Sequence, residues 1–185
     1  VPAEPGPCSN CRDGRFSWDR AQAAIVAEGI GIECIHRLKY GNEPWFATFL
    51  SALLLEAALP DLTGRPIQGI VPVPLHAVRL RERGFNQAER LARPLAEALG
   101  VPLVTDRVRR LEPTASQASL SREERRRNVR SAFGPSRPER IRGSWVVVDD
   151  VLTTGATTDA VCTVLRGLGA NEVSVWAVAR ATLDA

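Results

Sequence analysis

Two adjacent carboxylates stand at the end of an apolar run, and a short threonine-rich turn follows them. The stretch WVVVDDVLTTGAT places Asp149 and Asp150 directly before this turn. If residues 145–148 form a buried strand, the acids emerge at its carboxyl end, where open α/β sheets bind ligands. Backbone N–H groups of a tight turn, together with a helix N-terminus, form a site for an anion. The pattern predicts a phosphate site beside two carboxylates.

The acid pair and the turn together favour one kind of ligand. Carboxylates repel a phosphate, so Asp149 and Asp150 require hydroxyl or metal partners instead. A ribose 5′-phosphate satisfies both groups, since its hydroxyls can reach the acids, with Mg²⁺ nearby. The predicted 5′-phosphate contacts are Thr153, Thr154, Gly155, Ala156 and Thr157. A capped helix without a ligand is the alternative.

Spacing excludes three other classes of phosphate site. A P-loop requires lysine and a hydroxyl residue after its glycines, but the chain's single lysine, Lys39, follows Leu38. A GxGxxG dinucleotide fingerprint is absent from the sequence. The Asp-x-Asp pattern of haloacid-dehalogenase-like phosphatases is absent too, because Val151 and Leu152 stand two positions after the acids.

Apolar runs and helical patterns alternate along the chain, which predicts an α/β fold with a mainly parallel sheet and helices on both faces. The strand-like runs are 23–27, 67–73, 144–148 and 172–178, all expected to be buried. The helical patterns are 32–38, 45–59, 87–99 and 157–168. Pro94 is expected to kink the third helix or to start a second one after Ala92. Residues 112–120 are expected to form a long exposed loop before a short capped helix that begins at Arg122.

Composition indicates a soluble globular protein. The 185 residues suit one main domain, and 44% of them are hydrophobic. The longest apolar stretch, 45–59, is shorter than the ~20 residues that span a bilayer, and no signal sequence is evident, so a cytoplasmic location is expected. Residues 107–142 carry eleven arginines against four acidic residues, which favours a polyanionic ligand; a solvated charged surface is the alternative.

Three motifs resemble known families. The apolar run, acid pair and TTGAT resemble the phosphoribosyl-pyrophosphate (PRPP) motif of type I phosphoribosyltransferases. The stretches IVPVPLHAVRLRERGFNQAERLA and QASLSREERRRNVRSAF resemble the competence protein F (ComF) family. The resemblance implies a type I phosphoribosyltransferase fold over residues 19–185, with a hood at 19–60 and a PRPP-binding core at 61–185. Residues 1–18 would be the remnant of a zinc-finger-like segment.

The resemblance also implies a function. A ComF-type enzyme would transfer a phosphoribosyl group to an unidentified acceptor and release Mg-pyrophosphate, in association with competence and DNA uptake. The alternative is a protein that senses PRPP or a nucleotide, or handles single-stranded DNA, without turnover. DNA-uptake proteins are further candidate partners, membrane insertion is not expected, and the oligomeric state stays open.

Site residues follow from the resemblance by position. Asp149, Asp150 and Arg110 are the catalytic candidates. The pyrophosphate-binding loop would carry Leu75, His76, Arg79 and Arg83. A flexible loop would contribute Thr114 and Gln117, and the hood Lys39 and Tyr40. A structural role for His76, an ordinary surface position for Lys39 and a merely exposed loop are the competing interpretations.

Four cysteines are present, and only two are spaced as metal ligands. Cys8 and Cys11 form a CxxC pair, which is half of a zinc site, so zinc would require a second pair in the full-length protein. Cys34 and Cys162 lie in apolar helical patterns and are expected to be packed core thiols.

Overall fold

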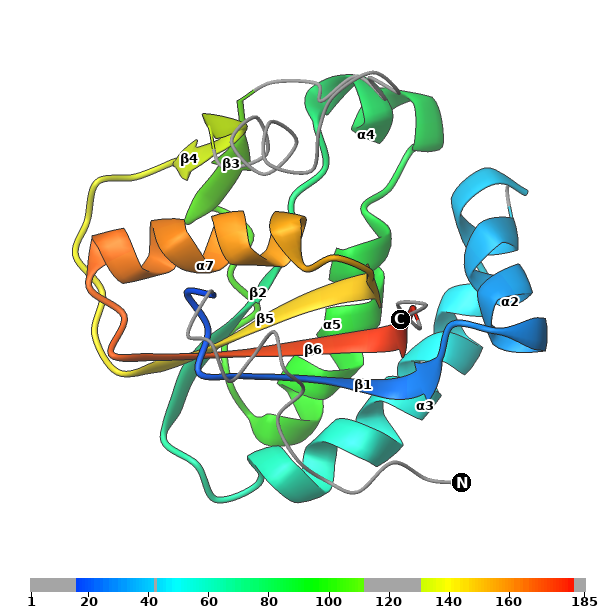
Figure 1. Cartoon of the computed structure of the whole chain (residues 1–185), viewed down its shortest axis with the longest axis horizontal. Coiled ribbons are helices and arrows are strands. Elements are labelled where there is room, and N and C mark those ends of the chain that lie inside the picture. Colours follow the sequence, from blue (N-terminus) through cyan, green and yellow to red (C-terminus); the bar gives the residue numbers. More distant parts are fainter. Residues whose placement is uncertain (1–15, 42, 112–130, 182–185) are drawn as a thin grey trace.

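The computed structural model describes residues 16–41, 43–111 and 131–181. Its centre is a four-stranded sheet in the order β1-β6-β5-β2, in which all neighbouring strands are parallel (Figure 1). The strands are β1 (Arg20–Val26), β2 (Ile67–Pro72), β5 (Ser144–Leu152) and β6 (Glu172–Arg180). A small antiparallel ribbon joins β3 (Val108–Arg110) to β4 (Phe133–Pro135).

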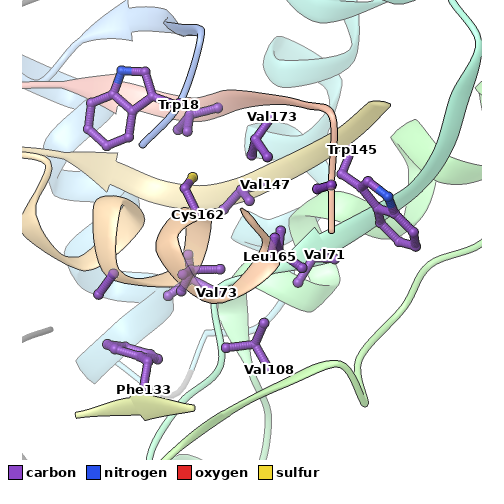
Figure 2. Close-up of a cluster of buried hydrophobic side chains, with 14 of the residues drawn as sticks. Trp18, Val71, Val73, Val108, Phe133, Trp145, Val147, Cys162, Leu165 and Val173 are labelled. Carbon is purple, nitrogen blue, oxygen red and sulfur yellow. The ribbon is translucent and has the colours of Figure 1, made fainter. Parts of the chain in front are cut away.

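Helices cover both faces of the sheet, which confirms the predicted fold class. On one face α7 (Ala156–Leu168) and the β3–β4 ribbon enclose the cluster around Val147, Cys162 and Leu165 (Figure 2). The other face carries α2 (Gly29–Tyr40), α3 (Phe46–Leu62) and α5 (Gln87–Leu99). The short helix α4 (Ala77–Arg83) follows β2. Strand β5 is buried on both faces, as its unbroken apolar run predicts.

The four longer strands and four longer helices all correspond to the predicted runs. The prediction that residues 23–27 form a buried strand is wrong in its burial, because β1 is an edge strand paired only with β6 and is mostly half-exposed. The short elements α4, β3 and β4 were not predicted. Three-residue strands carry too little periodicity to be recognised.

Pro94 does not divide its helix. A single α5 runs from Gln87 to Leu99, so the expected second helix after Ala92 is wrong. Leu91 and Ala92 before the proline and Leu95 and Ala96 after it are all buried in the core. Each fully buried leucine contributes roughly 1.5–3 kcal/mol, which offsets the ~3 kcal/mol cost of an internal proline.

Of the other predictions, one is confirmed and several are not tested by the described residues. Cys34 and Cys162 are buried free thiols, as predicted. The predicted loop 112–120, the capped helix from Arg122 and the Cys8–Cys11 pair lie outside the described residues. Trp18 packs in the sheet core, whereas the division into hood and PRPP-binding core stays a prediction. In the described part of the chain, no helix has the length and apolar character needed to cross a bilayer.

Candidate functional site

The two acids occupy the carboxyl half of β5 and are buried, with Asp149 8% and Asp150 3% exposed. Side chains alternate along a strand, so the two acids leave β5 on opposite sides, but their carboxylates still lie close enough to interact with each other. Val147 belongs to the core on the α7 face, and Val148 to the core on the α5 face. The acids continue this alternation, and the Asp150 N–H donates to Asp149 Oδ1 over 2.9 Å.

Asp150 meets two side chains from the helical layer. The Lys39 ammonium forms an ion pair with Oδ2, and the Gln87 amide donates to Oδ1 over 3.2 Å. Within the described residues, Oδ2 receives no aligned hydrogen bond. Burial opposes ionisation, but the Lys39 charge and the hydrogen bonds outweigh it and hold the pKa of Asp150 below its ordinary value. Asp150 is therefore an ionised carboxylate.

Asp149 is in the opposite electrostatic state. Burial, followed by the neighbouring Asp150 charge, raises the pKa of Asp149 well above its ordinary value. Burial and mutual repulsion therefore oppose a second negative charge on the pair. Arg110 of β3 is electrostatically coupled to Asp149 and lies 5.3 Å from the Phe133 ring; burial lowers its pKa.

The threonine turn is held from behind. Gly155 is the N-cap of α7 with φ of 78°, and an added Cβ would lie 2.5 Å from the Trp18 ring. Trp18 stacks on Phe16 with ring centroids 4.1 Å apart. The Asp159 carboxylate accepts the Ser17 N–H over 2.7 Å. These contacts fix the backbone of the turn against the N-terminal segment 16–19.

The outer side of the same turn is open. Thr153 and Thr154 are exposed, and the Gly155 N-cap makes no side-chain capping hydrogen bond. The nearest hydroxyl, Thr154 Oγ1, is 3.5 Å from the Ala156 N–H, which is long for a hydrogen bond. The first backbone N–H groups of α7 have no helical carbonyl partner, and an anion is complementary to such groups.

The predicted pyrophosphate loop spans the start of α4. His76 is the N-cap of this helix and its Nδ1 accepts the Val78 N–H over 3.2 Å, so it has a structural role in the observed conformation. Leu75 is half-buried. Arg79 is exposed, pairs with Glu82 at 3.0 Å, and acts electrostatically on Arg110 across the site.

Arg83 is joined to the acid pair through a residue that the sequence did not indicate. Its guanidinium donates to Gln87 Oε1 and lies 5.5 Å from the Tyr40 ring. Gln87 in turn donates to Asp150, so one buried amide connects the pyrophosphate loop to the acids. A glutamine at the start of the buried α5 stripe was the available signal, because buried polar side chains require partners.

The structure brings most of the predicted site together. Lys39 and Tyr40 end α2 beside Asp150 and Arg83, which rules out an ordinary surface position for Lys39. Thr114 and Gln117 lie outside the described residues. No description of the flexible loop follows from the structure.

The acid pair does not form a metal site by itself. Among the described residues there is no cluster of three or more His, Cys, Asp or Glu side chains that could hold a metal. Mg²⁺ binds oxygen ligands in near-ideal octahedral geometry, but burial and the Asp150 charge raise the pKa of Asp149, and Lys39 already forms an ion pair with Asp150 Oδ2. These residues do not fit a magnesium ion held by the protein alone.

Known proteins resemble the chain over most of its length. The family model described as phosphoribosyl transferase domain matches residues 83–182. Competence protein F of Haemophilus influenzae is 36% identical over 94% of this chain and 78% of its own length. The DNA utilization protein YhgH of Escherichia coli K12 is 35% identical over the same shares. Competence protein ComFC of Streptococcus pneumoniae is 34% identical over 94% and 80%. The domain match includes the acid pair, the turn and Gln87.

Proposed function

The chain belongs to the competence protein F family, and from this premise we propose that it binds PRPP and transfers the phosphoribosyl group to a nitrogenous acceptor. Its residues 83–182 match the phosphoribosyl transferase domain. The single observation that carries the proposal is the open N–H turn of residues 153–157, held rigidly beside two buried acids at the carboxyl end of β5. An anion and vicinal hydroxyls in one molecule describe a ribose phosphate.

Each group has a place in the proposed complex. The turn takes the 5′-phosphate, and the Asp150 carboxylate, whose lowered pKa keeps it ionised, accepts a hydrogen bond from a ribose hydroxyl. Asp149, with its raised pKa, can donate its proton to the second hydroxyl oxygen. Arg83 and Arg110 approach from the predicted pyrophosphate side and complement the leaving group.

The proposed reaction is a displacement at the anomeric carbon. The bond from C1 to the pyrophosphate oxygen breaks, pyrophosphate leaves with the electron pair, and the acceptor nitrogen supplies the pair for the new C1–N bond. The described residues act by positioning the sugar and stabilising the leaving-group charge. In the proposed reaction the acid pair does not hold a magnesium ion.

Calorimetry with PRPP in magnesium buffer tests the binding. The wild-type protein should bind, and Asp150→Asn should bind at least tenfold more weakly, because one charged acceptor for a hydroxyl is lost. Asp106→Asn is the matched control, since Asp106 is an exposed aspartate paired with Arg137 far along the chain from the turn. No binding, or equal binding by Asp150→Asn, would contradict the proposal.

Turnover is measured separately. Pyrophosphate release from PRPP is followed with a panel of purine bases, pyrimidine bases and amines as acceptors. Release that depends on one acceptor class and is lost in Asp150→Asn supports a transferase. PRPP binding without release from any acceptor would favour a PRPP sensor.

A DNA-handling function is the second candidate, favoured by the name of one relative, a DNA utilization protein, and by the arginine excess of residues 107–142. Affinity for single-stranded DNA should then fall steeply with salt, because phosphate contacts release counterions. It should also survive Asp150→Asn. DNA binding that disappears with this substitution would contradict an independent DNA surface.

A further inference from the structure

We propose that Lys39 is a built-in cation at the acid pair, which excludes a divalent metal from Asp149 and Asp150 in the ligand-free protein. This inference concerns the ligand-free protein and does not depend on the proposed function.

The ammonium is held in place by the fold. Lys39 lies in the last turn of α2, where the neighbouring Ile35 and Leu38 are fully buried in the core, 0% and 1% exposed. The Lys39 side chain is 20% exposed and the Asp150 side chain 5% exposed. A lysine anchored by a packed helix and paired with a buried carboxylate is a fixed charge, unlike a surface lysine that exchanges among many partners.

The carboxylate oxygens are already engaged. Asp149 Oδ1 faces the Asp150 N–H, Asp150 Oδ1 faces the Gln87 amide, and Asp150 Oδ2 faces the Lys39 ammonium. Three of the four oxygens therefore point at hydrogen donors or a positive charge. A metal on these oxygens would have to displace donors and approach an ammonium, and like charges at this distance repel strongly in a buried site.

The position of Lys39 also explains why a lysine rather than a metal would suit this site. One ammonium balances the charge of the ionised Asp150 carboxylate, with which it forms an ion pair. A divalent ion would add an excess positive charge and take up the same carboxylate. The site is thus arranged for a neutral sugar edge.

Mn²⁺ is the probe, because its binding to the ligand-free protein can be measured directly by electron paramagnetic resonance. The wild type should show no Mn²⁺ site that depends on the acid pair. Lys39→Met should gain one Mn²⁺ site that is at least tenfold tighter than any Mn²⁺ site of the wild type. The double variant with Lys39→Met and Asp150→Asn should lose this site. Lys39→Arg, which keeps the charge, should behave as the wild type.

Two outcomes overturn the inference. Either the wild type binds Mn²⁺ as tightly as Lys39→Met and loses it in Asp150→Asn, or Lys39→Met gains no site. PRPP calorimetry on the same preparations separates this result from the proposed function. A gained Mn²⁺ site without PRPP binding would retain the lysine's role and reject the function.

A second measurement uses the wild-type protein and requires no variant. Lys39 is the single lysine of the chain, so protein grown with nitrogen-15 lysine gives one side-chain ammonium signal in a nuclear magnetic resonance spectrum. Mg²⁺ alone should leave this signal unchanged at millimolar concentration. A shift with Mg²⁺ alone, in the direction of a freed ammonium, would overturn the inference.

Discussion

The threonine turn and the acid pair lie a few residues apart on one chain segment, but they are built in opposite ways. The turn is open to solvent, its N–H groups carry no side-chain cap, and its backbone is fixed from behind by Trp18. The acid pair is buried and neutralised by Lys39, a residue 111 positions earlier in the chain. The proposed phosphate half of the site is therefore preorganised by backbone geometry, whereas the proposed sugar half depends on side chains brought from α2 and α5.

The largest expected effect tests the rigid half. Gly155→Ala should lower the free energy of unfolding by about 3 kcal/mol, because a left-handed φ costs ~1–2 kcal/mol for a residue with a Cβ and the new methyl overlaps the buried Trp18 ring at 2.5 Å. Urea unfolding measures the loss. PRPP affinity should fall with it.

Gly84→Ala is the matched control for this change. Gly84 has the same φ of 78° at the C-cap of α4, but an added Cβ there meets nothing within 4 Å. It should cost only the ~1 kcal/mol of backbone strain. Equal losses in the two variants would contradict a specific contact between the turn and Trp18.

The next effect tests the neutralised half. Lys39→Met should lower the free energy of unfolding by about 2 kcal/mol, less than the 3–5 kcal/mol of a fully buried pair, because the lysine is partly exposed. Asp150→Asn should cost less, about 1 kcal/mol, since the freed ammonium can turn toward water. Thermal or urea unfolding compares the two.

An exposed ion pair provides the control. Arg37 pairs with Glu43 at 2.6 Å, and its side chain is 48% exposed. Arg37→Met should change stability little, within the usual range of surface pairs. If Lys39→Met were as mild as Arg37→Met, the Lys39–Asp150 pair would not be the fixed charge inferred here.

How far the sequence predicts this molecule follows from the range of each signal. The apolar run into Asp149 and Asp150 and the TTGAT turn are local, so strand β5 and helix α7 were predicted correctly, and the phosphate site between them stays a prediction. The pairing of Lys39 with Asp150 was not, because it depends on where α2 packs against the sheet, which no local pattern encodes. Gln87 was missed for the same reason, although a polar residue in a buried stripe signals an unseen partner.

The two acids should also differ in how they respond to pH. Burial raises the pKa of Asp149 in the folded state, so the unfolded chain loses this proton at a lower pH than the folded protein does. Folding stability therefore falls between the ordinary aspartate pKa, about 4, and the raised value. Asp149→Asn removes this penalty and should stabilise the protein at neutral pH by an amount on the order of 1 kcal/mol.

Asp150 behaves in the opposite sense. Its pKa is lowered in the folded state, so its stabilising contribution is present above the ordinary aspartate pKa and is lost as pH falls through the lower folded value. Asp150→Asn should therefore lose stability at neutral pH. Unfolding free energies of both variants from pH 4 to 8 check the contrast, and a stability loss in Asp149→Asn would refute the raised pKa of Asp149.

The smallest expected effect on stability returns to the open turn. Thr154 is exposed and its hydroxyl is only 3.5 Å from the Ala156 N–H, so Thr154→Val should leave the free energy of unfolding within about 0.5 kcal/mol of wild type. PRPP affinity should still fall roughly fivefold, since a hydrogen bond to a phosphate is worth ~1 kcal/mol net. Thr163→Val is the control. This change within α7 removes a hydroxyl that donates to the Asp159 carbonyl, and it should leave PRPP affinity unchanged. Equal affinities for both variants would show that the backbone N–H groups bind the phosphate without the Thr154 hydroxyl, and would confine the preorganised half of the site to the main chain.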